Sequence, residues 1–327
     1  MNNKPLASLS RRQTIVSVAA LGIGLPLAGG VACAQGQSVL RVGYQKYGTL
    51  TLLKAKGDLE KRLAPQGVDV KWTEFPAGPV LLEALNVGSI DFGTVGEVPP
   101  IFAQAAGADL LYVANQPPAP AGEAILVPKG SPLKSVAELK GKKVALNKGS
   151  NVHYLLVKAL ENAGVPYSAI QPVYLAPADA RAAFERGAVD AWVIWDPFFA
   201  AAEKQLGARI LVDGKGLVSN HQFYLASRAH ADKSPQVLQA VVDELSGLDA
   251  WAAKSPADVA KLLAPQIGLD IGITEVAVSR FAYGIQPITA AVAAEQQKIA
   301  DAFFKLGLIP QAVKVSDSVW HGRAVQG

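Results

Sequence analysis

Segments with the pattern of a strand and segments with the pattern of a helix alternate along residues 39–213. This alternation constrains the fold more than any other feature. We predict strands at 39–44, 68–75, 90–95, 110–116 and 123–130, and helices at 49–63, 78–88, 99–106 and 151–162. Residues 171–228 continue as strand, helix, strand, helix and two strands, and a mostly helical stretch follows from 234 to 306. Such alternation predicts mainly parallel sheets with helices on both faces, and the runs 39–122 and 131–213 predict two α/β lobes.

The bulk composition is that of a globular protein with room for two domains. The chain has 327 residues, of which 50% are hydrophobic and 18% are charged. Its net charge is +4, but residues 1–34 hold three basic and no acidic side chains. The rest of the chain therefore has 28 basic against 27 acidic groups. The excess charge therefore belongs to the N-terminus. Without a basic stripe interleaved with aromatic residues, we expect no nucleic-acid partner.

The N-terminus has the pattern of an export signal. Arg11 and Arg12 precede an uncharged stretch, 15–34, that ends in Ala-Cys-Ala. We predict a signal peptide over residues 1–34 of the twin-arginine type and therefore a periplasmic protein. A membrane anchor is the alternative, and a lipid anchor at Cys33 is a third. Because Cys33 is the only cysteine, a chain cut after Ala34 has no disulfide, no thiolate nucleophile and no cysteine metal ligand.

Small polar residues and glycines occur where predicted strands run into predicted helices. Four such joints offer a set of candidate donors and close-approach positions: Gln45, Thr94, Gly96, Ser150, Asn151, His153 and Asp196. In open α/β sheets, ligands bind beyond the carboxyl ends of the strands. Helix N-termini carry free N–H groups and partial positive charge, so several of them around one cleft can bind an anion without a cation. The joints therefore predict a pocket for the head group of a small anion.

Each joint also has a structural interpretation, because Ser, Thr, Asp and Gly are common helix caps and turn residues. Trp195 ends a buried strand, where it can belong to the core or form an apolar wall of the pocket. Glu97 and Asp196 oppose a bound anion, so we expect them to accept backbone N–H groups or to meet a cationic part of the ligand. Lys46 and Lys148 are the cations beside the joints, and both can point to solvent.

Motifs of the common hydrolases and nucleotide-binding enzymes are missing. The sequence has no G-x-S-x-G, no G-x-x-x-x-G-K-[ST] and no H-E-x-x-H. Its four histidines, His153, His221, His230 and His321, are scattered. We therefore expect a protein that is not an enzyme and that has no metal site and no cofactor.

Four long segments resemble the aliphatic-sulfonate-binding proteins of ABC importers. They are LRVGYQKYGTL, FPAGPVLLEALNVGSIDFGTVGEVPPIFAQAAGADLLYV, LKGKKVALNKGSNVHYLLVKAL and YLAPADARAAFERGAVDAWVIWDPFFAAAE. The resemblance covers nearly all of the chain after the signal. It implies a two-lobed type II periplasmic binding protein fold with two hinge crossings. Lobe 1 would comprise 38–124 and 225–327, and lobe 2 would comprise 125–224.

The resemblance also implies a function and a set of ligand residues. By position these are Gln45, Thr94, Gly96, Ser150, His153, Trp195 and Asp196. Glu97 stands where the family leads us to expect Asp, and Asn151-Val152 replaces a more serine-rich stretch. The implied protein is a monomer that captures a sulfonate for sulfur acquisition and delivers it to the importer's permease subunits. A taurine- or nitrate-type binding protein is the nearest alternative, and an enzyme on the same fold, such as a pyrimidine-precursor synthase, is another.

Overall fold

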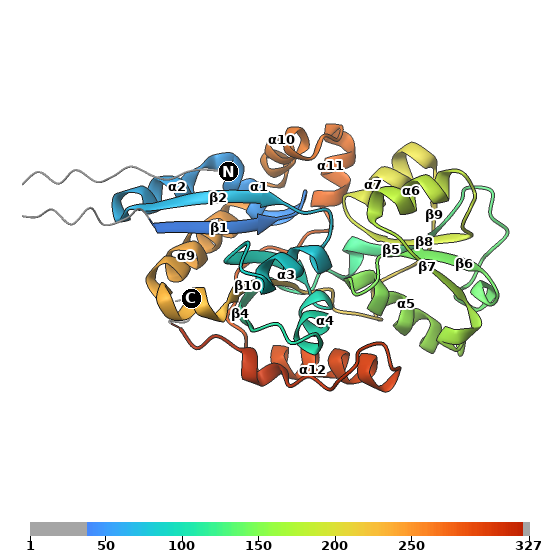
Figure 1. Cartoon of the computed structure of the whole chain (residues 1–327). Coiled ribbons are helices and arrows are strands. Elements are labelled where there is room, and N and C mark those ends of the chain that lie inside the picture. The colour runs from blue at the N-terminus through green and yellow to red at the C-terminus, as the bar shows by residue number, and fades with distance from the viewer. Residues whose placement is uncertain (1–37, 323–327) are drawn as a thin grey trace, which may run out of the picture. The chain divides into compact units, whose positions relative to one another are not determined.

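The computed structural model describes residues 38–322, which form two five-stranded sheets flanked by helices (Figure 1). The first sheet has the strand order β2-β1-β3-β10-β4 and contains β1 (Ser38–Tyr44), β2 (Val68–Glu74), β3 (Phe92–Gly96), β4 (Leu110–Asn115) and β10 (Gln222–Ser227). The second has the order β7-β6-β8-β5-β9 and contains β5 (Glu123–Val127), β6 (Lys143–Leu146), β7 (Gln171–Tyr174), β8 (Ala191–Trp195) and β9 (Arg209–Asp213).

Each sheet contains one strand that runs against the other four. In the first sheet β1 pairs in parallel with β2 and β3, whereas β10 is antiparallel to β3 and β4. In the second, β6 pairs in parallel with β7 and β8, whereas β5 is antiparallel to β8 and β9. The reversed strand is in each case the one that enters from the other sheet. The prediction of two mainly parallel sheets is confirmed.

The helices follow the predicted alternation, and α5 has the predicted bounds. They are α1 (Gly48–Lys56), α2 (Asp58–Leu63), α3 (Gly78–Asn86), α4 (Pro99–Ala105), α5 (Asn151–Asn162), α6 (Pro177–Glu185), α7 (Phe198–Leu206), α8 (Arg228–Lys233), α9 (Pro235–Ala252), α10 (Pro256–Ile267), α11 (Ile271–Val278) and α12 (Ala290–Lys305). Short 3₁₀ turns occur at 64–66, 120–122, 136–139, 167–169 and 315–318. None of the helices within residues 38–322 is long and apolar enough to span a bilayer.

Apolar clusters lie on both faces of each sheet. One cluster of the first sheet includes residues of α1, α2, α9 and α10, and the other includes residues of α3, α4 and α12. In the second sheet, α5 contributes to one cluster, and α6 and α7 contribute to the other. Fully buried side chains such as Phe92 and Trp192 belong to these clusters, and burying a large apolar side chain contributes about 1.5–3 kcal/mol. This packing fixes the strand ends that carry the candidate site.

Two predicted features are refined by the structure. The single helix predicted at 49–63 is broken at Gly57, whose φ of 66° lies in the left-handed region that ends α1. The chain changes sheets at 116–122 and 214–221, a few residues before the predicted lobe boundaries at 125 and 225. The division into two moving lobes stays a prediction, and the predicted signal peptide lies outside the described residues.

Candidate functional site

A pocket of about 720 Å³, including its opening to solvent, is lined by residues from both sheets and from the segments that connect them. Five of the seven ligand residues predicted from the sequence line it: Gln45, Gly96, Ser150, Trp195 and Asp196. They come from the ends of β1, β3 and β8 and from the start of α5. Because the carboxyl ends of parallel strands lie at one edge of a sheet, separate joints are brought to one place. Contact of these residues with a ligand stays a prediction.

Thr94 is absent from the pocket lining and lies behind Gln45. Its hydroxyl donates to the carbonyl of Phe223 at 3.1 Å, and its own carbonyl accepts from Gln45 Nε2 at 3.2 Å. Alternate side chains of a strand point to opposite faces, so a position close to a joint does not ensure that its side chain enters the pocket. Thr94 can therefore affect ligand binding only indirectly, through its carbonyl, which orients the Gln45 amide.

His153 also lies outside the lining and is fully buried. Its Nδ1 accepts from the Gly149 N–H at 3.3 Å, and its Nε2 lies 3.0 Å from the Tyr167 hydroxyl. Burial lowers the pKa of His153 to about 4, with a smaller contribution from Lys148, so the ring is neutral at pH 7. A neutral ring that accepts at Nδ1 donates at Nε2, which leaves neither nitrogen for a ligand.

Three helices of nine or more residues present their first turns to the pocket. Gly48 and Thr49 of α1, Gly78 of α3 and Asn151 of α5 line it. No N-cap side chain bonds to these first turns, because Tyr47 and Ala77 make no cap contact and the Ser150 hydroxyl donates to the Asn147 carbonyl at 2.7 Å. The free N–H groups and partial positive charge of these helix ends suit an anion.

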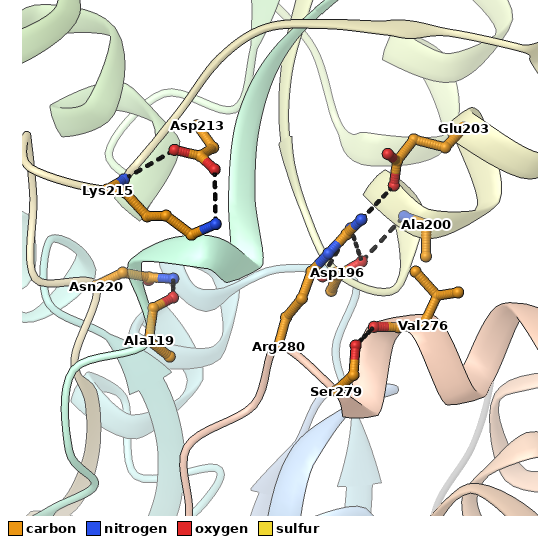
Figure 2. A network of polar contacts seen from close by, with 10 residues as sticks. All are labelled: Ala119, Asp196, Ala200, Glu203, Asp213, Lys215, Asn220, Val276, Ser279 and Arg280. Atoms are coloured by element: carbon orange, nitrogen blue, oxygen red, sulfur yellow. Dashed lines mark hydrogen bonds and ion pairs between the residues drawn. The ribbon is translucent and has the colours of Figure 1, made fainter.

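Arg280 is a pocket residue that the sequence did not indicate. It follows α11, and its Nη1 lies 3.3 and 3.4 Å from the two carboxylate oxygens of Asp196, while its Nη2 lies 2.6 Å from Glu203 Oε2 (Figure 2). Arg280 reaches these partners because α11 packs against α7 through a small apolar cluster that includes Ile273 and Ala200. Such a long-range contact has no local sequence signal.

Asp196 is the carboxylate among the lining residues, and it is nearly fully buried. Burial raises its pKa to about 7, and the neighbouring Arg280 and the Ala200 N–H, which donates to Oδ1 at 2.9 Å, limit the rise. Helix α7 begins at Phe198 with Pro197 at the N-cap position, so Asp196 bonds to the first turn from one residue before the N-cap. The expectation that Asp196 accepts a backbone N–H is confirmed.

Lys46 and Lys148 do not line the pocket. Lys46 is half exposed, and its Nζ lies 3.4 Å from Glu74 Oε1. Lys148 is exposed, and its Nζ lies 5.5 Å from the centre of the Tyr174 ring. Arg280 is thus the only basic side chain among the described lining residues, and it already pairs with two carboxylates. The side chains of the pocket therefore offer no uncompensated positive charge.

Asn151 joins parts of the chain that belong to different sheets. Its Oδ1 accepts from the Val98 N–H at 3.3 Å, and its Nδ2 donates to the side chain of Asn220 at 2.5 Å. The Asn151 amide lies directly over Gly96, where a Cβ would lie 2.0 Å from Asn151 Nδ2. Gly96 thus permits the close approach that its position at a joint predicted.

Glu97 lies behind the pocket and is fully buried. Its Oε2 accepts from the His221 N–H at 3.1 Å, a backbone bond of the kind that we expected for this carboxylate, and its Oε1 has no partner among the described residues. Burial raises the pKa of Glu97 to about 8, against the lowering effect of the His221 and Asn220 N–H groups. Within residues 38–322, no three His, Cys, Asp or Glu side chains are grouped so that they could hold a metal ion.

The chain matches one family model and is similar to sulfonate-binding proteins of known sequence and structure. Residues 63–258 match the NMT1/THI5-like family. An aliphatic sulfonates-binding protein of Escherichia coli K12 is 46% identical over 96% of this chain and 99% of its own length. The alkanesulfonate-binding protein SsuA of Xanthomonas axonopodis pv. citri, solved with MOPS bound, is 45% identical with a TM-score of 0.83, over 86% of this chain and 98% of its own. The periplasmic aliphatic sulphonate-binding protein SsuA of Escherichia coli is 47% identical with a TM-score of 0.79, over 89% and 94%.

Proposed function

We propose that this chain, which belongs to the NMT1/THI5-like family and, within it, to the aliphatic-sulfonate-binding proteins, captures aliphatic sulfonates in the pocket described above. It is a substrate-binding protein and not an enzyme. The observation that carries the proposal is the combination of that membership with a pocket to which three uncapped helix ends point.

The chemistry of a sulfonate matches this pocket. Its head group is a monoanion with three acceptor oxygens, which the N–H groups of α1, α3 and α5 can share. Its carbon tail can lie against Trp195 and Phe281, which also line the pocket. Each buried CH₂ adds about 0.8 kcal/mol, so the tail contributes affinity that a bare anion lacks.

Side-by-side calorimetry at pH 7.5 and one ionic strength, in a buffer without a sulfonate group, tests the proposal. We expect butanesulfonate to bind about tenfold more tightly than ethanesulfonate, because it buries two more CH₂ groups. Sulfate should bind more weakly than either, because its second charge faces Asp196 and Glu203 and Arg280 is already paired. Nitrate should also bind weakly because it has no tail.

The same titrations, with taurine added to the series, separate the alternatives. Taurine binding above butanesulfonate would favour the taurine-type protein, and nitrate binding above both would favour the nitrate type. Sulfate equal to butanesulfonate would mean that Arg280 leaves its carboxylates for the ligand, and the proposal of an anion-plus-tail pocket would then fail.

Trp195 should report binding. Because its ring lines the pocket, we expect saturating butanesulfonate to change the tryptophan fluorescence of the protein and Trp195→Phe to abolish that change. Trp251→Phe is the matched control, because Trp251 lies under Lys56 Nζ, 4.6 Å from its ring centre, and does not line the pocket. A full ligand signal in Trp195→Phe would assign Trp195 to the core.

We further propose that the mature protein is a periplasmic monomer that works with the permease subunits of an ABC importer in sulfur acquisition, and that its two lobes close on the ligand about the crossings 116–122 and 214–221. The family membership and the two passages of the chain between sheets support this part of the proposal.

Export should remove residues 1–34. The twin arginines and the Ala-Cys-Ala site predict that the secreted protein begins at Gln35. N-terminal sequencing of protein from the periplasmic fraction measures this directly. A chain that begins at Met1 would contradict export, and a lipid-modified Cys33 at the N-terminus would replace the soluble form with an anchored one.

A further inference from the structure

The buried carboxylate of Asp249, which lies below the pocket, forms hydrogen bonds to three of the segments around it. Asp249 lies in α9, is fully buried and does not line the pocket itself. Its Oδ1 accepts from the Thr49 hydroxyl at 2.6 Å, and its Oδ2 accepts from Gln116 Nε2 at 2.7 Å and from the Gly284 N–H at 2.9 Å. One side chain of a distant helix thus bonds to three separate segments.

Each of those segments contributes to the pocket. Thr49 belongs to the first turn of α1, which is one of the three helix ends. Gln116 begins the first crossing between the sheets, and its N–H donates at 2.9 Å to the carbonyl of Gln222, the first residue of β10 after the second crossing. Gly284 directly follows residues 280–283, which line the pocket and include Arg280.

The Thr49 hydroxyl cannot serve a ligand as a donor while this arrangement holds. A hydroxyl has one hydrogen, and Thr49 donates it to Asp249 while it accepts from Gln116 Nε2 at 2.9 Å. If the hydroxyl is removed, any change in anion affinity therefore comes from the lost bond to Asp249 and not from a lost contact between the hydroxyl and the anion.

We propose that Asp249 is a positioning residue of the binding site, which holds the α1 end, the first crossing and the 280–284 segment in the arrangement that receives the ligand. This inference rests on the proposed function for its ligand readout. It predicts an effect opposite to that of charge alone, because a buried negative charge below an anion pocket opposes binding. If Asp249 mattered only through its charge, its neutralisation would tighten anion binding.

The test compares Asp249→Asn with Val242→Ala, a buried substitution in the same helix that leaves the Asp249 bonds intact. We expect Asp249→Asn to weaken butanesulfonate binding at least about tenfold, since the amide Nδ2 cannot accept as Oδ2 does, and Val242→Ala to stay within about twofold of the parent protein. Unchanged or tighter binding in Asp249→Asn, or an equal loss in Val242→Ala, overturns the inference.

Two further measurements keep the test decisive. Hydrogen exchange without ligand should show faster exchange of the Gly284 amide in Asp249→Asn only, and unchanged exchange overturns the inference even if the parent protein binds no sulfonate. A parent protein without sulfonate binding overturns the proposed function alone. If Asp249→Asn does not fold, Thr49→Val should weaken binding about fivefold, and Thr49→Ser, which keeps the hydroxyl, should weaken it less than Thr49→Val does. Equal affinities in these two variants overturn the inference.

Discussion

Replacement of Glu97 by glutamine should remove a large part of the loss of stability that we expect between pH 5 and pH 8. Burial raises the pKa of Glu97 to about 8 in the folded protein, from the ordinary value of 4.5 that it has in the unfolded chain. Between these two values the native chain keeps a proton that the unfolded chain has lost. The free energy of unfolding therefore falls as pH rises, by roughly 1.4 kcal/mol per pH unit, or about 4 kcal/mol over three units.

The difference between Glu97→Gln and the parent protein should grow in favour of the variant by that amount, because glutamine keeps an oxygen for the His221 N–H and does not titrate in this range. Urea denaturation at half-unit pH steps measures the difference. The matched control is Glu275→Gln, the same chemical change at an exposed glutamate of α11, which should show a constant difference from the parent. A Glu97→Gln curve that runs parallel to that of the parent would contradict the prediction.

Substitution of Gly96 by alanine should weaken sulfonate binding by roughly thirty- to a hundredfold, or about 2–3 kcal/mol. The new Cβ would lie 2.0 Å from Asn151 Nδ2 and 2.1 Å from its Oδ1, so the Asn151 amide must move. It then loses its bonds to the Val98 N–H and to Asn220, which join parts of the chain from different sheets. Calorimetry with butanesulfonate measures the effect.

Gly122→Ala is the control for this variant. Gly122 also lines the pocket, but a Cβ there would have its nearest neighbour at 3.6 Å, which is ordinary van der Waals contact. We expect Gly122→Ala to bind within about twofold of the parent protein. Equal losses in the two variants would show that any side chain added at the pocket wall is harmful, and the specific role of the Gly96–Asn151 contact would then be wrong.

The sequence predicted the places where strands meet helices better than the direction of individual side chains. Gln45, Ser150 and Asp196 lie at joints, and the parallel strands bring those joints together, so a local pattern was sufficient. Thr94 and His153 belong to the same joints, but their side chains bond to Phe223, Gly149 and Tyr167 and not to the pocket. A sequence pattern gives the position of a residue along an element, whereas the packing of other elements decides what it faces.

Arg280 and Asp249 could not be predicted from a local pattern, because their partners are far away in the sequence. Arg280 pairs with Asp196 and Glu203, more than 70 residues earlier, only because α11 packs on α7. Asp249 is one polar residue in an otherwise apolar stripe of α9, which the periodicity assigns to core packing. A charged residue in such a stripe was the available signal, and it indicated burial without naming the partners.

The position of β10 has a consequence for the order in which a newly made chain can assemble. All five strands of the second sheet lie within residues 123–213, so that sheet can be complete as soon as this stretch has left the ribosome. The first sheet is begun earlier but finished later, because β10 at 222–227 fills the place between β3 and β4. Until then β3 and β4 each keep an edge of unpaired backbone groups that other chains could join. Synthesis that pauses before residue 228 would therefore leave the nascent chain with one finished sheet and one open to aggregation.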